Sequence, residues 1–391
     1  MAQPTTPTPS RRRTTRTRVP ERYWNHASGA TPSLLIFIFV YQRKLFMSRQ
    51  PRQRDVAANI WVTGKCNLHC SYCFYDHELK VDMDEKTLQA SANWINRNGV
   101  TRLDFYGGEA LSHPYGVKYL LAKTNCRKYG ITTNGTLLDD EIFTWLRLFN
   151  VGIALSFDGT KDTQDKYRGG SYDKIMENLP RLQALNANVL TVGADIDHLY
   201  ENIEHIKDLG FRNVFINPLN PYSDHGYKGN LEDFEDVYRQ IIMDLHNPPH
   251  FSINDFVKYA NIAKNREKSK WGGCGINRAG QTIGPSGYIY PCHRAVEMGR
   301  EVAMGSVFQG IDPVRRDIIK KQSGQVPEKC RTCEDDLKCL PCPVSCFNYH
   351  GEYGKDPEDW YCDALKTRFR VVRSLIDEGH FNWFNNNLLR S

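Results

Sequence analysis

Long apolar runs are scarce in this chain. Hydrophobic residues make up 40% of its 391 residues, but the longest unbroken apolar run covers only residues 34–41. Because a helix needs roughly 20 predominantly apolar residues to cross a bilayer, we expect no membrane span. Arg43 and Lys44 close that run, and no small-residue cleavage site follows it, so a targeting segment is not expected either.

Excess basic charge is also missing from most of the chain. Residues 1–54 hold eleven Arg and Lys side chains and one acid, a net charge of +10, so the formal +6 of the whole chain leaves −4 for residues 55–391. A mildly acidic body is a poor surface for nucleic acid, and we expect no nucleic-acid partner. Segment 1–54 is rich in Pro, Thr and Arg, which predicts a disordered basic tail, or a start placed too early with Met47 as the natural one.

The composition lacks the bias of fibrous or disordered proteins, because only 25% of the residues are charged and 12% are aromatic. Collagen-like, coiled-coil and wholly disordered classes are therefore excluded. Cysteine is plentiful, with twelve residues, most of them at short spacings in a chain large enough to bury a core without disulfides. This pattern suits metal ligation by thiolates in a reducing compartment, so we expect a cytoplasmic protein.

Short apolar segments alternate with helical periodicity between residues 58 and 217. The pattern predicts strands at 60–63, 102–106, 130–133, 151–157, 189–195 and 213–217, with helices at 84–97, 139–149, 172–185 and 200–209. Such alternation is typical of parallel βαβ units, whose chemistry lies at the carboxyl ends of the strands. Cys66, Gly107, Asn134 and Asp158 all follow predicted strands, so we expect them to converge on one rim.

The sequence pattern changes after residue 271. Helices are predicted at 231–246, 254–269 and 364–378, but residues 272–363 hold eight cysteines and little helical period. A loop-rich segment of this kind has little apolar core and needs cross-links to be stable, which metal clusters would supply. We therefore divide the chain into a tail (1–54), a barrel core (55–217), a helical connection (218–271), a cysteine-rich domain (272–375) and a second tail (376–391).

The first cysteine motif is C-x3-C-x2-C, formed by Cys66, Cys70 and Cys73. Three thiolates bind three irons of a cubane and leave the fourth without a protein ligand, whereas a cluster used only for electron transfer is usually capped by four cysteines. An open position lets a substrate or cofactor bind the metal. The alternatives are a zinc knuckle, with His69 or His77 as the fourth ligand, or unrelated thiols.

With Tyr72 before the last cysteine and Phe74 after it, this motif resembles the signature of the radical S-adenosylmethionine (SAM) superfamily. The resemblance implies a 4Fe–4S cluster on the three cysteines, with SAM chelating the open iron through its amino and carboxylate groups. It also implies one-electron cleavage of SAM to methionine and a 5′-deoxyadenosyl radical, which takes hydrogen from the substrate.

Later strand ends resemble the SAM-binding segments of the same superfamily. Glu109 ends a Gly-Gly-Glu segment at the place where members bind the SAM amino group, although a lone segment of this kind is also an ordinary turn. Ser156, with Arg168 twelve residues later, resembles the fourth-strand motif of the peptide- and sulfatase-modifying branch, whereas a surface salt bridge is the alternative for Arg168. The cofactor-binding residues implied are Tyr72, Gly107, Gly108, Glu109, Asn134, Ser156 and Arg168, with Ile216 and Asn217 beside the adenine.

The cysteines after residue 272 resemble the SPASM extension, which carries two auxiliary 4Fe–4S clusters. The resemblance implies an outer cluster on Cys330, Cys333, Cys339 and Cys362, and an inner one on Cys274 and Cys292 with Cys342, Cys346 or both. The family has C-x3-C after the Cys339 position, whereas this chain has C-x2-C-x3-C. If only one of Cys342 and Cys346 binds, the inner cluster has an open iron. The cysteine left over, Cys126, is expected in the core.

The expected fold is therefore α/β, a partial (β/α)6 TIM-like barrel with a C-terminal loop-rich Fe–S (SPASM) domain. The expected cofactors are SAM and three 4Fe–4S clusters, and the expected activity is hydrogen abstraction from a peptide residue to install a crosslink or an oxidative modification. His293 follows Cys292 at the position where sulfatase-maturing relatives have an aspartate base. It is a candidate catalytic base, or else a structural histidine near a cluster.

Other functions stay open at this point. They are a formylglycine-forming sulfatase maturase, against which His293 counts, and a non-catalytic Fe–S scaffold or electron carrier. The partners expected are a peptide or protein substrate and a reductant such as flavodoxin or ferredoxin. Residues 1–54 are too short and too rich in Pro and Arg for a fused leader-recognition domain. We therefore expect either a separate leader-peptide recognition protein or direct leader binding by the barrel.

Overall fold

The computed structural model describes residues 56–75, 80–193, 195–217, 231–264, 280–334 and 341–380. The basic tail, His77, Cys274 and Cys339 lie outside the described residues. None of the described helices is both long and apolar enough to cross a membrane.

Six parallel strands form the centre of the described structure, as predicted. They are β1 (Ala57–Trp61), β2 (Arg102–Tyr106), β3 (Lys128–Thr133), β4 (Val151–Ser156), β5 (Asn188–Thr191) and β6 (Asn213–Ile216), and each pairs in parallel with the next. Ile60, Phe105, Leu155 and Val189 are fully buried within them. The strands are covered by helices, as buried parallel sheets require.

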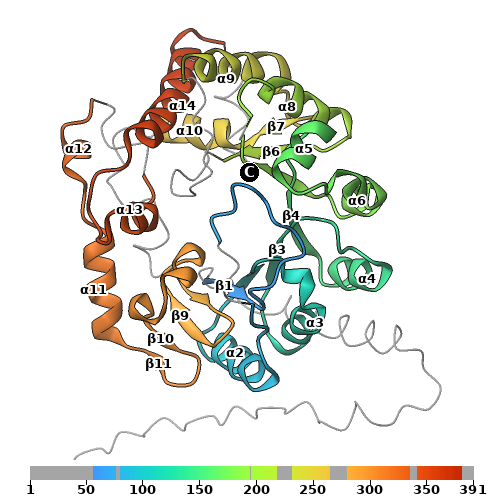
Figure 1. The fold of residues 1–391 in the computed structure, drawn as a ribbon, viewed down its shortest axis with the longest axis vertical. Coiled ribbons are helices and arrows are strands. Elements are labelled where there is room, and N and C mark those ends of the chain that lie inside the picture. Colours follow the sequence, from blue (N-terminus) through green and yellow to red (C-terminus); the bar gives the residue numbers. More distant parts are fainter. Residues whose placement is uncertain are drawn as a thin grey trace, which may run out of the picture. The chain divides into compact units, whose positions relative to one another are not determined.

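The connecting helices lie on the outer side of these strands (Figure 1). They are α2 (Glu85–Arg97), α3 (Pro114–Lys123), α4 (Asp140–Leu148), α5 (Lys161–Tyr167), α6 (Tyr172–Glu177), α7 (Leu179–Ala184) and α8 (Leu199–Asp208). Asp84 and Asp139 cap α2 and α4, accepting hydrogen bonds from the backbone N–H of Thr87 and Ile142, both at 2.7 Å. Their positions agree with the predicted helix starts.

The single helix predicted over residues 172–185 is wrong, because the structure has two short helices there. Pro180 has no N–H to donate to the carbonyl of Met176, so the backbone ladder is interrupted. Asn178 occupies the break, where its Nδ2 donates to the carbonyl of Gly135 at 3.0 Å and its Oδ1 accepts from Arg181 at 3.1 Å. The break therefore ties the helices to the end of β3.

The sheet extends beyond the six predicted strands. β7 (Ser252–Ile253) pairs in parallel with β6, and β8 (Thr282–Ile283) pairs in parallel with β1. β9 (Tyr288–Tyr290), β10 (Gly305–Ser306) and β11 (Gly310–Ile311) continue in antiparallel order, so β7 and β11 form the two edges. The open edges agree with a partial barrel. Strands this short leave no periodic signal, although Gly287, with φ +79°, marks the turn before β9.

The C-terminal part contains more helix than the sequence predicts. α9 (Leu231–Leu245) and α10 (Asn254–Lys264) pack on α14 (Asp359–Asp377), which begins five residues before its predicted start and includes Cys362. α11 (Pro313–Ser323), α12 (Glu328–Arg331) and α13 (Pro343–His350) lie in the segment predicted as loop-rich. α11 buries only Ile319 and Ser323, so it shows no apolar stripe in the sequence. Among the residues that the structure describes, three short turns are 3-10 helices. One lies between β2 and α3, η2 (Ala110–Ser112), and two follow β9, η4 (His293–Met298) and η5 (Arg300–Val302).

His246, just after α9, is expected to make stability pH-dependent. It is buried, its Nδ1 accepts the N–H of Ile253 at 3.0 Å, and burial lowers its pKa from 6.5 to about 4. The neutral ring stabilises the fold above pH 6.5, and this contribution, on the order of 3 kcal/mol, is lost as the pH falls toward 4. Urea unfolding of the protein and of His246→Gln at pH 7.5, 5.5 and 4.5 checks this. A pH slope that is the same in both would contradict it.

Candidate active site

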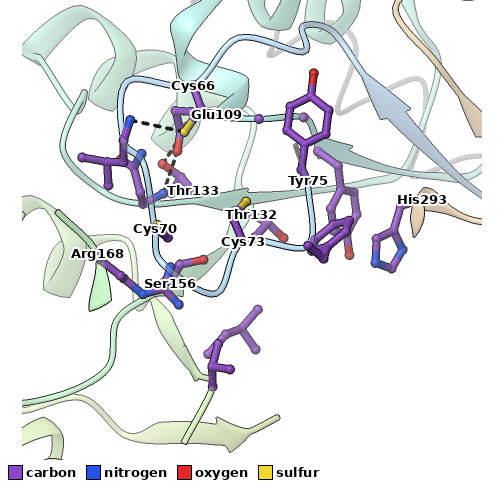
Figure 2. A pocket seen from close by; sticks show the side chains of 18 of the residues that line it. Cys66, Cys70, Cys73, Tyr75, Glu109, Thr132, Thr133, Ser156, Arg168 and His293 are labelled. Carbon is purple, nitrogen blue, oxygen red and sulfur yellow. Dashed lines mark hydrogen bonds between the residues drawn. The ribbon is translucent and has the colours of Figure 1, made fainter. Parts of the chain in front are cut away.

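A cavity of about 500 Å³ lies at the carboxyl ends of the strands. Cys66, Cys70 and Cys73 enter it from one loop after β1, and Ser156 and Arg168 lie near them (Figure 2). Its lining includes every predicted cofactor-binding residue and His293, namely Tyr72, Gly107, Gly108, Glu109, Asn134, Ser156, Arg168 and His293. The structure thus brings these residues together. Asn217 also lines the cavity, whereas Ile216 is buried beneath it.

A network of amides holds the start of the cysteine loop on β3. Asn67, next to Cys66, donates from Nδ2 to Thr136 Oγ1 at 2.8 Å and accepts from Asn134 Nδ2 at 2.9 Å. Asn134 Oδ1 in turn accepts from the backbone N–H and the hydroxyl of Thr136. Asn134 therefore lines the cavity and also holds the start of the cysteine loop in place through its hydrogen bond to Asn67.

A second, charged network holds the other end of the loop. The Tyr72 hydroxyl donates to Asp158, and Arg168 Nε donates to the same carboxylate at 2.8 Å. Asp158 also accepts from Thr191 Oγ1 at 3.1 Å and from the N–H of Val192 at 3.0 Å. Asp158 and Arg168 are 2% and 7% exposed, so this is a buried ion pair and not the surface salt bridge left open by the sequence.

Electrostatics in this network favour the charged forms. Burial alone would raise the pKa of Asp158, but the neighbouring Arg168 and its hydrogen bonds lower that pKa below its ordinary range. Burial raises the pKa of the Cys70 thiol, and Arg168, which hydrogen-bonds to it, opposes that rise. Arg168 therefore favours a thiolate at Cys70.

Glu109 is buried at the start of η2. Its carboxylate accepts from the N–H of Leu111 at 2.9 Å, from Thr133 Oγ1 at 3.0 Å and from the N–H of Asn134 at 2.7 Å. Burial raises its pKa, and these three hydrogen bonds oppose the rise. The carboxylate is thus fixed in place at the cavity wall, where it can receive a cationic group.

The two glycines before Glu109 allow close backbone approach. A Cβ on Gly107 would lie 2.5 Å from the carbonyl oxygen of Thr63, and one on Gly108 would lie 2.6 Å from that of Lys65. Their immediate role in the structure is therefore to let β2 pass directly against the segment that leads into the cysteine loop.

The thiols of this loop fit an iron–sulfur cubane. Burial raises the pKa of Cys66 to about 11 and that of Cys73 to about 12, with nearby thiols adding to the rise, so these thiols need a metal charge to ionise. Among the described residues, no three His, Cys, Asp or Glu side chains meet on one point as ligands of a single ion. A cubane instead gives each thiolate its own iron. His69, the zinc candidate, is exposed.

His293 lines the cavity beside the end of the cysteine loop. Its ring stacks on Tyr106 at 4.8 Å between centroids and meets the edge of Phe74 at 6.5 Å, while the guanidinium of Arg294 lies 5.4 Å from the centre of the Phe74 ring. Burial, with Arg294 beside it, lowers the pKa of His293 to about 3. The imidazole is therefore neutral at pH 7 and can accept a hydrogen bond.

The C-terminal cysteines form two neighbourhoods. Cys292 and Cys342 pack against the same apolar cluster as Cys73 and Tyr353. Cys330 lies elsewhere, where burial and the nearby Cys362, Cys333, Asp356 and Cys346 raise its pKa to about 12. Cys126 is buried in the main core, as predicted.

Sequence reasoning missed the residues that hold the loop. Asn67, Thr136 and Thr191 carry no motif of their own, and Asp158 was identified only as a strand end. The usable signal was position, since Asn67 lies inside the cysteine motif and Asp158 follows the fourth strand.

Comparison with known proteins identifies the central domain. Residues 60–209 match the model of the Radical SAM superfamily. Residues 60–209 are a radical SAM domain. The radical SAM match covers β1 to α8, the part of the chain that contributes the cysteine loop, Glu109, Ser156 and Arg168.

Individual relatives agree with this radical SAM assignment. The chain is 28% identical over 273 residues to the cysteine-type anaerobic sulfatase-maturating enzyme of Clostridium novyi, covering 59% of this chain and 71% of that protein. The fold is similar to native anSMEcpe with bound AdoMet and Cp18Cys peptide, with a TM-score of 0.68, 20% identity, and coverage of 83% of this chain and 99% of that one. It is also similar to Streptococcus suis SuiB bound to precursor peptide SuiA, with a TM-score of 0.57, 14% identity, and coverage of 78% and 75%.

The chain is thus a radical SAM enzyme, for which SAM and a 4Fe–4S cluster are the cofactors. The donor set fits both groups. Three half-buried thiols line the cavity, and a carboxylate, a hydroxyl and a guanidinium lie on its wall.

Proposed function

We propose that this radical SAM enzyme modifies a peptide, removing hydrogen from one of its residues to install a crosslink or an oxidative change. The observation that carries the proposal is the single cavity that joins the cysteine loop to Glu109, Ser156 and Arg168 on one side and to His293 on the other. Peptides bound to anSMEcpe and SuiB, which share the fold, support a peptide substrate.

Each wall residue has a distinct task in this proposal. When bound, the cluster and SAM supply the radical that takes hydrogen from the substrate. Cys66, Cys70 and Cys73 hold the cluster, and Glu109 receives the SAM ammonium group. Ser156 and Arg168 receive the SAM carboxylate. Arg168 uses Nε and Nη2 on Asp158, which orients the guanidinium before SAM arrives.

His293 faces the substrate side of the cavity. Because burial keeps its imidazole neutral, one ring nitrogen can accept a hydrogen bond from a substrate group. Tyr106 and Phe74 fix the ring plane. We propose His293 as the base or hydrogen-bond acceptor for the peptide.

Anaerobic assay tests the function directly. Reconstituted protein with SAM and dithionite should form 5′-deoxyadenosine, and mass spectrometry of a precursor peptide encoded beside this gene should show a loss of hydrogen mass. Metal-loaded protein that never cleaves SAM would refute the enzyme and leave the scaffold or electron carrier.

A sulfatase maturase is the second candidate. The 28% identity to the Clostridium novyi enzyme favours it, whereas His293 in place of an aspartate disfavours it. A sulfatase-derived peptide containing the target cysteine or serine separates the two. Formylglycine in that peptide, with no change in the precursor peptide, would select the sulfatase maturase.

We also propose two auxiliary 4Fe–4S clusters, with Cys342 on the inner one. Cys292 and Cys342 share one apolar cluster, whereas Cys346 lies near Cys330. Cys342→Ala is therefore expected to perturb the inner cluster, whereas Cys346→Ala should leave the inner cluster in place, because Cys346 is not among the residues that pack with Cys292. Electron paramagnetic resonance should show loss of the inner-cluster signal in Cys342→Ala and its retention in Cys346→Ala, with Cys126→Ala as the control. Loss of the same signal from both variants would contradict the assignment.

A further inference from the structure

The outward face of α11 combines apolar and basic side chains. Val314 and Ile318, one turn apart, are 67% and 50% exposed, and Val314 is the most exposed large hydrophobic residue among those described. Residues four apart lie on the same side of a helix. Lys321, three residues after Ile318, lies on the same side of the helix. An exposed apolar pair ringed by charge is typical of a transient interaction site.

The charge on this helix is positive. α11 contains four cations and one acid in eleven residues, whereas residues 55–391 together carry −4. The acid, Asp317, is paired with Arg316 at 3.0 Å. Lys320 and Lys321 are exposed, and Arg315 donates to the carbonyl of Glu301 at 2.8 Å beside the apolar pair. The face therefore attracts an acidic surface.

The position of α11 links this face to the cysteines. A short connection joins α11 to α12, which carries the buried Cys330, and both helices lie on the same side of the fold (Figure 1). Eleven helical residues span about 16 Å, so the contact area that this helix can offer is small. Small, charge-steered interfaces are characteristic of short-lived electron-transfer encounters.

We propose that the outward face of α11 docks a small acidic one-electron carrier of the flavodoxin or ferredoxin kind. The proposal rests on the proposed function, because each reductive cleavage of SAM consumes one electron. In the encounter the carrier is oxidised by one electron and the enzyme is reduced by one, with no group transferred. Lys321 on this face and the exposed Lys320 on its flank steer the carrier, and Val314 and Ile318 form the apolar centre of the contact.

Charge reversal tests the surface. 5′-Deoxyadenosine formation is measured with dithionite, and separately with an acidic flavodoxin, its reductase and NADPH. Lys320→Glu/Lys321→Glu should reduce the flavodoxin-driven rate at least tenfold at low salt and leave the dithionite-driven rate within twofold. Rising salt should slow the flavodoxin-driven rate of the unmodified protein, because exposed charges are screened. Equal flavodoxin-driven rates in variant and unmodified protein would overturn the proposal.

A matched control uses two exposed lysines on other helices. Lys174→Glu/Lys207→Glu, on α6 and α8, changes the net charge by the same amount and should leave both rates unchanged. An equal loss in this control would assign the effect to net charge and overturn the proposal. Val314→Ser/Ile318→Ser should raise the flavodoxin concentration needed for half the maximal rate.

A binding measurement separates this proposal from the proposed function. Oxidised flavodoxin titrated against the full chain should bind weakly, and Lys320→Glu/Lys321→Glu should abolish the binding, even if the protein cleaves no SAM. Absence of binding to the unmodified chain would overturn docking while leaving dithionite-driven activity intact. If the variant loses peptide modification with dithionite as the reductant but keeps dithionite-driven SAM cleavage, the face binds substrate and the proposal is wrong.

Discussion

Replacing Cys66, Cys70 and Cys73 together by Ala is expected to abolish formation of 5′-deoxyadenosine under dithionite. These thiols line one cavity, where each would bind its own iron of the cluster. Removing a mere supporting partner of a metal site typically costs roughly 10- to 100-fold, so losing all the protein ligands should exceed that. The measurement is anaerobic SAM cleavage, with iron and sulfide counted in the same samples.

The iron content distinguishes a lost ligand set from a lost fold. The triple variant should keep the iron bound by the C-terminal cysteines, because none of those that the structure describes lines the cavity. Cys126→Ala is the matched control, since this core cysteine lies outside the cavity lining. Its SAM cleavage should stay near that of the unmodified protein. Persistent cleavage in the triple variant would refute the assignment.

Arg168→Met is expected to reduce both stability and SAM binding. The variant leaves Asp158 buried at 2% exposure without its cation. Breaking a buried ion pair by removing one partner typically costs about 3–5 kcal/mol. SAM affinity should fall as well, because the guanidinium that faces the cavity is gone. Urea unfolding and equilibrium dialysis with SAM measure the two effects separately.

A double variant separates the loss of stability from the loss of SAM affinity. Arg168→Met/Asp158→Asn removes both charges but keeps an oxygen that can accept from Thr191 and from the N–H of Val192. It should recover part of the lost stability, because no uncompensated charge stays buried. It should not recover SAM affinity. Lys161→Met, which breaks an exposed pair with Asp173 at 2.6 Å, is the control and should change neither quantity measurably. Full SAM affinity in the double variant would exclude Arg168 from the SAM site.

Much of the fold was predictable because its signals are local. Six strands, the Asp84 and Asp139 caps and the helices they begin follow from apolar periodicity and capping chemistry along the chain. The exceptions have physical causes. Pro180 divides a helix that is periodic on both sides, β8 is only two residues long, and α11 buries too little to show a stripe.

Spacing, strand ends and the family resemblance predicted residues that the structure brings to one cavity, but they did not predict the partners of those residues. Asn67 meets Asn134 and Thr136, and Tyr72 meets Asp158, across 67 to 86 residues of chain. No local pattern reports such pairings, because they depend on how neighbouring strands bring their ends together. The same holds for Cys342 and Cys346, whose different neighbourhoods the cysteine spacing left open.

The sequence by itself determined the three-thiol motif, the alternation of strands and helices, and therefore the class of chemistry at one rim. Spacing along a chain specifies which donor atoms exist and on which element each begins. Only the tertiary structure decided that Asp158 neutralises Arg168 in the interior and that His293 reaches the cavity as a neutral ring. Charge state depends on burial and on contacts between distant segments, and both arise only when the sheet is assembled.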